Sequence, residues 1–275
     1  MSANVGRVAV VTGAGSGIGR ALALALAARG ARVALADLDA DAVAETGRRC
    51  RQLGARVRTD VVDVTDRRAV AEYPAAVLAE YGRVDAVFAV AGVIHVGALL
   101  DSDLVDVEHV FDVNVRGVVW TAKAFLPHLV ASGDGRLVTV SSAFGLAAMP
   151  YYSAYSASKA AVRAFTAALR QELAADGHPV AVTCAVPGGV RTPIMRRGRY
   201  APSEDPAAVA EAFDRRIART DAGAAAEVIL HGAERRRAQV LVGPDARLVS
   251  WLARLVGSSY QNLLPRLLRA GLLRR

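Results

Sequence analysis

The chain has 275 residues, of which 53% are hydrophobic and 22% charged. This length is enough for one large hydrophobic core, and the composition excludes disordered and fibrous proteins. The net charge is +8, but only Lys123 and Lys159 among the 34 basic residues are lysine, and no aromatic–basic pattern accompanies the arginines, so we expect no nucleic-acid partner.

Membrane, secretion and metal signals are weak. No apolar run has the length of a membrane span, and the first residues lack the basic flank and cleavage site of a signal peptide. The two cysteines, Cys50 and Cys184, are too few for a disulfide framework or a zinc site of the usual spacing. We therefore expect a cytoplasmic protein without a bound metal.

Short apolar runs alternate with longer amphipathic stretches, which is typical of repeated βα units. The sequence predicts strands over residues 8–12, 33–36, 57–61, 86–90, 136–141, 180–186 and 239–242. It predicts helices over 18–29, 40–53, 67–81, 104–131, 153–175 and 222–235. The expected fold is a doubly wound, Rossmann-like α/β fold, in which a parallel sheet of about seven strands carries helices on both faces. We expect residues 1–244 to form a single domain.

A glycine-rich segment, Thr-Gly-Ala-Gly-Ser-Gly-Ile-Gly over residues 12–19, follows the first predicted strand and opens the first helix. Glycines allow a tight turn there and a close approach of the backbone to an anion, and the free N–H groups of the helix point at a phosphate. The position between a strand and a helix makes this a dinucleotide-binding motif. We expect Gly13, Ser16, Gly17 and Ile18 to contact the cofactor.

An acidic residue, Asp37, ends the second predicted strand. In this position a carboxylate accepts hydrogen bonds from the ribose hydroxyls of the adenosine and repels a 2′-phosphate. No basic side chain stands at Ser16 or Leu38 to bind that phosphate, so the sequence favours NAD over NADP. The alternative is that Asp37 caps the helix over 40–53, a role that Asp39 fills equally well.

The pair Tyr155 and Lys159 lies four residues apart, and therefore on one face of the helix over 153–175. A tyrosine of ordinary pKa is a poor acid–base catalyst at neutral pH, and a neighbouring cation lowers that pKa. One of only two lysines in an arginine-rich chain stands here. We interpret the pair as catalytic, although an exposed helix pair of no chemical significance has the same spacing.

Together these residues resemble the short-chain dehydrogenase/reductase family, in the branch with Thr-Gly-x-x-x-Gly-x-Gly and Tyr-x-x-x-Lys motifs, over about residues 5–245. The resemblance implies that Ser142, thirteen residues before Tyr155, binds the substrate oxygen and that Asn114 holds a water of the proton relay. It implies that Asp63 and Val64 border the adenine ring, and that Ala91 and Gly92 lie near the ribose. It implies that the segment over 187–192 closes over the nicotinamide, through Pro187, Gly188, Val190 and Thr192, with Tyr155 and Lys159 also contacting the cofactor.

One motif departs from the family. The chain has Ala89-Val90-Ala91-Gly92 where the family usually has Asn-Asn-Ala-Gly. Ala91 and Gly92 preserve the close approach of the backbone, but the asparagine side chain that braces the central sheet is missing. The missing asparagine therefore affects the expected affinity for the cofactor more than the expected catalytic reaction.

The resemblance and the residues imply the same reaction. A nicotinamide exchanges hydride with a secondary alcohol or its ketone while Tyr155 moves the hydroxyl proton as general base or acid. The alternatives are an NADPH-dependent ketoreductase of fatty-acid or polyketide type, which Asp37 disfavours, and a non-catalytic nucleotide-binding or scaffold protein with this fold. The intact set of Asn114, Ser142, Tyr155 and Lys159 argues against the second. We expect a homodimer or homotetramer.

The segments expected to wall the substrate site are rich in apolar residues, which favours a small hydrophobic alcohol or ketone. The candidate pocket residues are His95, Phe144, Met149, Tyr152 and Met195, the last of them in a substrate loop over about 191–220. His95 is the one ionisable member, and we interpret it as a pocket-rim residue rather than a second base.

The last segment, 245–275, predicts amphipathic helices that extend beyond the domain. Its apolar stripe comprises Leu248, Trp251, Leu252, Leu255, Val256, Leu263, Leu264, Leu267 and Leu268, and arginines stand at 247, 254, 266, 269, 274 and 275. We expect the stripe to be buried against protein, with the arginines facing solvent or another subunit. The alternative is peripheral contact with the inner surface of a membrane.

Overall fold

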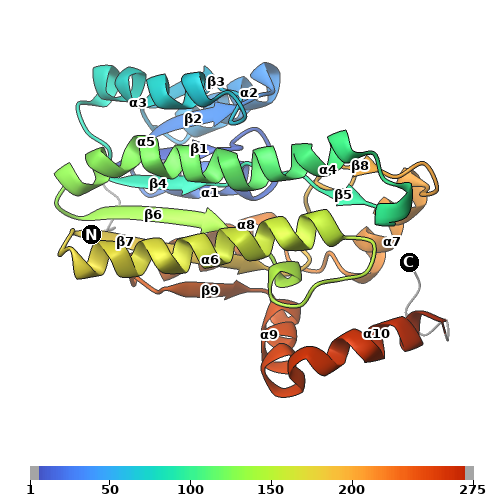
Figure 1. The fold of residues 1–275 in the computed structure, drawn as a ribbon. Coiled ribbons are helices and arrows are strands. Elements are labelled where there is room, and N and C mark those ends of the chain that lie inside the picture. Colours follow the sequence, from blue (N-terminus) through green and yellow to red (C-terminus); the bar gives the residue numbers. More distant parts are fainter. Residues whose placement is uncertain (1–5, 270–275) are drawn as a thin grey trace.

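The computed structural model describes residues 6–269, and its centre is a seven-stranded parallel sheet of order β3-β2-β1-β4-β6-β7-β9 (Figure 1). The strands are β1 (Val8–Thr12), β2 (Arg32–Asp37), β3 (Val57–Val61), β4 (Ala86–Ala89), β6 (Gly135–Val140), β7 (Val180–Pro187) and β9 (Gln239–Val242). All seven predicted strands are present, each within one residue of its expected bounds. The doubly wound α/β fold is confirmed.

Two layers of helices cover the sheet, as the apolar character of both strand faces requires. Helices α1 (Gly17–Ala28), α2 (Ala40–Gln52) and α8 (Ala222–Glu234) pack on one face, where Leu22, Leu26 and Ile229 are fully buried. Helices α3 (Arg67–Tyr81), α5 (Gly117–Ala131) and α6 (Ser153–Ala175) pack on the other, around Phe125 and Leu129.

The helix predicted over 104–131 is present without a break, but it contains a π turn that the sequence did not predict. The structure divides it into α4 (Leu104–Phe111), a π-helical turn over Asp112–Arg116, and α5. A π turn holds one residue more than an α turn, and such turns often occur at functional sites. Here it carries Asn114, whose side chain is completely buried and reaches the backbone that follows β4.

Three elements between the expected ones were not predicted. The short strands β5 (His95–Val96) and β8 (Arg199–Tyr200) pair as a separate two-stranded sheet. Helix α7 (Pro206–Arg216) lies in the expected substrate loop, and its N-cap Asp205 accepts hydrogen bonds from the N–H groups of residues 207 and 208. The Asp-Pro start of α7 is a recognisable helix signal, whereas strands of two residues have no periodicity to detect.

Two helices follow β9, as expected: α9 (Pro244–Val256) and α10 (Tyr260–Arg269), which lead away from the sheet (Figure 1). The stripe of α9 is not buried against the body of this chain, because its five apolar side chains are exposed there. The side chains of Leu263, Leu267, Leu268 and Arg269, and residues 274 and 275, lie outside the described part. Within residues 6–269, no helix is long and apolar enough to cross a membrane.

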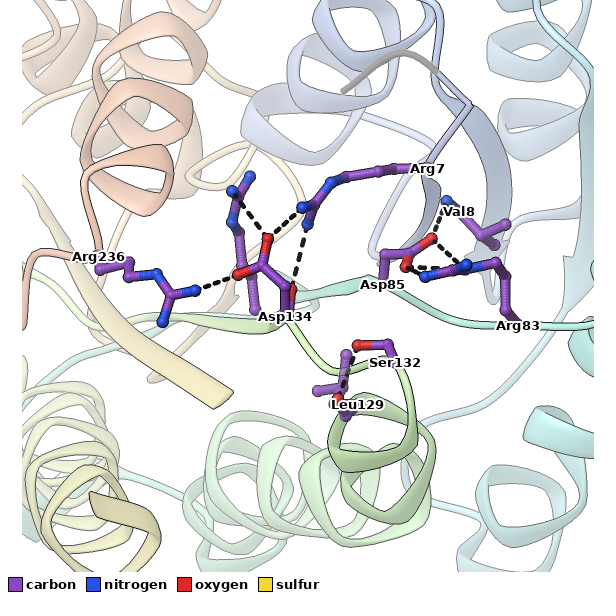
Figure 2. A network of polar contacts seen from close by, with 9 residues as sticks. Arg7, Val8, Arg83, Asp85, Leu129, Ser132, Asp134 and Arg236 are labelled. Carbon is purple, nitrogen blue, oxygen red and sulfur yellow. Dashed lines mark hydrogen bonds and ion pairs between the residues drawn. The ribbon is translucent and has the colours of Figure 1, made fainter. Parts of the chain in front are cut away.

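An ionic network holds the amino ends of the strands, at the edge opposite the cavity described below (Figure 2). Asp134 pairs with Arg7, with Arg236 and, at 3.6 Å, with Arg136. Asp85, only 2% exposed, accepts from the Val8 N–H at 2.8 Å and pairs with Arg83. Burial raises the pKa of Asp134, but the hydrogen bond from Arg7 and the three arginine charges outweigh it and hold the pKa below its usual value.

Candidate active site

A cavity of about 650 Å³ opens at the carboxyl ends of β1, β2, β4, β6 and β7. It lies beside the point between β1 and β4 where the strand order reverses, which is where doubly wound sheets bind ligands. Every residue that we expected to contact the cofactor lines it: Gly13, Ser16, Gly17, Ile18, Asp37, Asp63, Val64, Ala91, Gly92, Tyr155, Lys159, Pro187, Gly188, Val190 and Thr192.

The glycine-rich turn between β1 and α1 is packed too closely for side chains. A Cβ atom on Gly19 would lie 2.0 Å from the Gly13 carbonyl oxygen, and one on Gly13 would lie 2.7 Å from the Ala91 nitrogen. Gly13 also has a φ of +68°, which favours glycine. Ser16 precedes α1 without a side-chain cap, so the first N–H groups of the helix face the cavity uncapped.

Asp37 stands at the end of β2 with its carboxylate against the turn. Oδ2 accepts from the Gly15 N–H at 2.7 Å, and Oδ1 accepts from the Asp39 N–H at 3.0 Å. The N-cap of α2 is Asp39, which accepts from the Ala42 N–H at 3.0 Å. Asp37 therefore does not cap that helix, and its carboxylate lies on the cavity wall.

The departure at Ala89-Val90 is compensated by other groups. Ala89 is buried in one cluster with Val118 and Val162, and the Thr12 hydroxyl accepts from the Val90 N–H at 3.2 Å. Asn114 holds the backbone of Val93, because its Oδ1 accepts from the Val93 N–H and its Nδ2 donates to the Val93 carbonyl, both at 2.9 Å. The strand end is thus braced without the usual asparagine.

Three polar side chains that sequence reasoning singled out lie together on the cavity wall: Ser142, Tyr155 and Lys159. Ser142 lies two residues beyond β6, where it opposes the rise that burial causes in the pKa of Tyr155 and accepts from the Phe144 N–H at 3.2 Å. Lys159, one turn further along α6, donates from Nζ to the Val140 carbonyl at 3.1 Å, and Nζ lies 5.7 Å from the centroid of the Tyr155 ring. All three are buried, Lys159 to 3% exposure.

Burial sets the protonation of this group. It raises the pKa of Tyr155 to about 12, although the hydrogen bond with Ser142 opposes the rise. It lowers the pKa of Lys159 to about 8. At neutral pH the tyrosine therefore holds its proton, whereas burial brings the pKa of Lys159 down towards neutral pH.

Ser158 and Asn114 connect the π turn to α6, and sequence reasoning missed Ser158. Its hydroxyl donates to the Tyr155 carbonyl at 2.8 Å and accepts from Asn114 Nδ2 at 3.0 Å. Asn114 does not itself line the cavity, so it acts in this structure by tying the π turn to α6. Its position directly before Lys159 in the sequence is the signal that could have identified Ser158.

The segment after β7 covers the glycine-rich turn. A Cβ atom on Gly17 would lie 3.0 Å from the Thr192 methyl carbon, and Arg197 reaches Asp39 at 3.4 Å on the other side. Asp245, from α9, also lines the cavity and accepts from the Gly189 N–H at 2.5 Å. Sequence reasoning did not predict this contact of Asp245.

The end of the cavity beyond Tyr155 is apolar. Of the five predicted substrate residues, Phe144, Met149 and Met195 line it, joined by Val93, Ile94, Ile194, Phe213, Ile217 and Val249. Tyr152 packs on Phe144, with ring centroids 5.1 Å apart, but is not on the wall. His95 is also absent from the wall, because β5 buries it to 3% exposure, and burial lowers its pKa.

Comparison with known proteins decides the family. The family model described as short chain dehydrogenase matches residues 7–201. The chain belongs to the short-chain dehydrogenase family. It is similar to SadH, an oxidoreductase by name, of Mycobacterium tuberculosis (48% identity, covering 96% of this chain and 95% of SadH). It is also similar to estradiol 17-beta-dehydrogenase 11 of Mus musculus (31% identity, covering 94% and 83%).

Among solved structures, a short-chain dehydrogenase/reductase from Burkholderia phymatum in complex with NAD superposes with a TM-score of 0.86 at 30% identity, covering 93% of this chain and 95% of that one. This oxidoreductase is thus of a family that binds a nicotinamide cofactor. The cavity fits such a group: its glycine cradle leaves no room for side chains, and uncapped N–H groups face it. Within residues 6–269, no group of three or more metal-ligating side chains occurs.

Proposed function

We propose that this oxidoreductase uses NAD to interconvert hydrophobic secondary alcohols and ketones. The observation that carries the proposal is that Tyr155 lines the cavity with Ser142 and Lys159 and also packs in the same cluster as the apolar wall residues Phe144, Ile94 and Met195. The NAD complex of the Burkholderia phymatum protein and the name of estradiol 17-beta-dehydrogenase 11 support the cofactor and the substrate class.

Each residue has one task in this reaction. When bound, the nicotinamide accepts hydride from the alcohol carbon or returns it to the ketone. Tyr155 takes the hydroxyl proton in oxidation and gives it back in reduction. The Lys159 cation favours the tyrosinate form, and the Ser142 hydroxyl holds the substrate oxygen as charge develops on it. The apolar walls orient the substrate and exclude water.

The test of this proposal is a panel of secondary alcohols with lengthening alkyl chains, assayed with NAD through the absorbance of the reduced cofactor. Because each buried methylene contributes about 0.8 kcal/mol, kcat/KM should rise up to about fourfold per added group until the cavity is filled. No turnover with any member, or a preference for short polar alcohols, would contradict the proposal.

The two directions of the reaction should depend oppositely on pH. Oxidation needs Tyr155 to accept a proton, so its rate should increase with pH, whereas reduction needs the protonated tyrosine and should slow. Lys159→Met removes the cation and should move the oxidation profile to higher pH. Lys123→Met, at the chain's other lysine and exposed on α5, is the matched control. Identical profiles in both directions would refute the role of Tyr155.

A further inference from the structure

Helix α9 presents an apolar face to solvent. Leu248, Trp251, Leu252 and Leu255 are 56%, 59%, 42% and 64% exposed, and their spacing of three and four residues places them on one side of the helix. Val256 continues the same face at 38% exposure. Isolated exposed apolar residues are ordinary, but a contiguous group of this size on one helix marks a contact surface.

Basic residues border this face. Arg247 and Arg254 are exposed and seven residues apart, which places both along one edge of it, beside Trp251. Residues 246–275 contain six arginines and no aspartate or glutamate. The acid that precedes them in the sequence, Asp245, is turned inward to the Gly189 N–H. The surface of α9 therefore combines large apolar side chains with exposed arginines and carries no acidic side chain of its own.

The opposite side of α9 belongs to the cavity. Ala246 and Ser250 are buried, and Asp245 and Val249 line the cavity wall. The tail has a second attachment, because the Ala148 N–H donates to the Tyr260 hydroxyl at 3.1 Å, next to the wall residue Met149. One short helix thus separates the apolar end of the cavity from the exposed apolar face.

We propose that the outer face of α9 docks on the surface of an anionic phospholipid membrane, so that substrates dissolved in lipid reach the cavity beside it; the substrate part rests on the proposed function. Apolar side chains enter the headgroup–acyl boundary while arginines bind lipid phosphates. A symmetric contact between two copies is disfavoured, because it would bring the arginine edges together with no acidic residue on this face to pair with them.

The experiment is co-sedimentation of the full-length protein with vesicles at low salt. Binding to phosphatidylglycerol vesicles should exceed binding to neutral phosphatidylcholine vesicles at least about tenfold. Trp251→Glu/Leu255→Glu should abolish it, and each of Arg247→Gln and Arg254→Gln should weaken it about fivefold. Leu100→Glu is the matched control, since Leu100 is fully exposed before α4 and should leave binding unchanged.

Other outcomes overturn the inference. Absence of vesicle binding, or binding that survives Trp251→Glu/Leu255→Glu, contradicts docking through α9. A dimer in solution that the same double substitution converts to monomer, without vesicle binding, would assign the face to a second copy. Oxidation of a short, water-soluble secondary alcohol without vesicles tests the proposed function separately, so that loss of docking with retained turnover rejects only the membrane contact.

Discussion

Tyr155→Phe should remove nearly all turnover while cofactor binding stays close to that of the wild type. The substitution deletes only the hydroxyl that moves the substrate proton, and loss of general acid–base catalysis costs on the order of a hundredfold or more in kcat. The ring that packs edge-on to Phe144, with centroids 6.2 Å apart, is retained. Steady-state oxidation rates and the cofactor dissociation constant from tryptophan fluorescence or calorimetry give the two readouts.

A matched control is Tyr73→Phe, which makes the same chemical change in α3. Tyr73 packs against Phe125 in the core and is not on the cavity wall, so turnover should remain within a few-fold of the wild type. If the Tyr155 variant keeps a normal rate, or if both variants lose activity equally, the hydroxyl has no part in the chemistry.

The second large effect concerns the cofactor. The wild type should prefer NAD over NADP by at least about tenfold, because a 2′-phosphate beside the Asp37 carboxylate places like charges together at a cost of more than about 1 kcal/mol. Asp37→Ala combined with Leu38→Arg removes the repulsion and supplies a cation, since Leu38 lines the same part of the cavity and is 66% exposed. The preference should reverse in kcat/KM.

Leu38→Arg alone separates the added charge from the lost carboxylate. We expect it to improve NADP use only modestly, because Asp37 remains. The double variant should also use NAD less well than the wild type, since the Gly15 N–H loses its acceptor. Tighter binding of NADP than NAD by the wild type would overturn the assignment of Asp37.

The strands of the sheet and the motifs shared with the short-chain dehydrogenase family could be predicted from the sequence, because both depend on local patterns. Buried parallel strands appear as short apolar runs, and the Tyr155–Lys159 pair follows from helical spacing alone. The π turn at Asn114 could not be predicted in this way, because the apolar pattern of its residues continues the helical pattern of α4 and α5. The pairing of His95 with Arg199 joins residues about a hundred positions apart, and it buries a histidine that sequence reasoning placed at the pocket rim.

The tail over 245–275 shows a different limit of prediction from the sequence. Its helical periodicity predicts α9 and α10, but periodicity does not say which face meets the protein. In the structure the smaller residues Ala246 and Ser250 face the body and the larger apolar ones face outward. Asp245 resembles an ordinary residue of a first helical turn, and only the fold brings it to the Gly189 N–H.

The extra residue in the π turn over Asp112–Arg116 fixes the register of the site. An α-helix turns by about 100° per residue, so deleting one residue there would restore regular hydrogen bonding between α4 and α5 while rotating one helix against the other by that angle. Asn114 would then leave both Val93 and Ser158. A deletion that makes this helix regular should therefore break the hydrogen bonds through which Asn114 holds the segment after β4 and α6, and so lower activity.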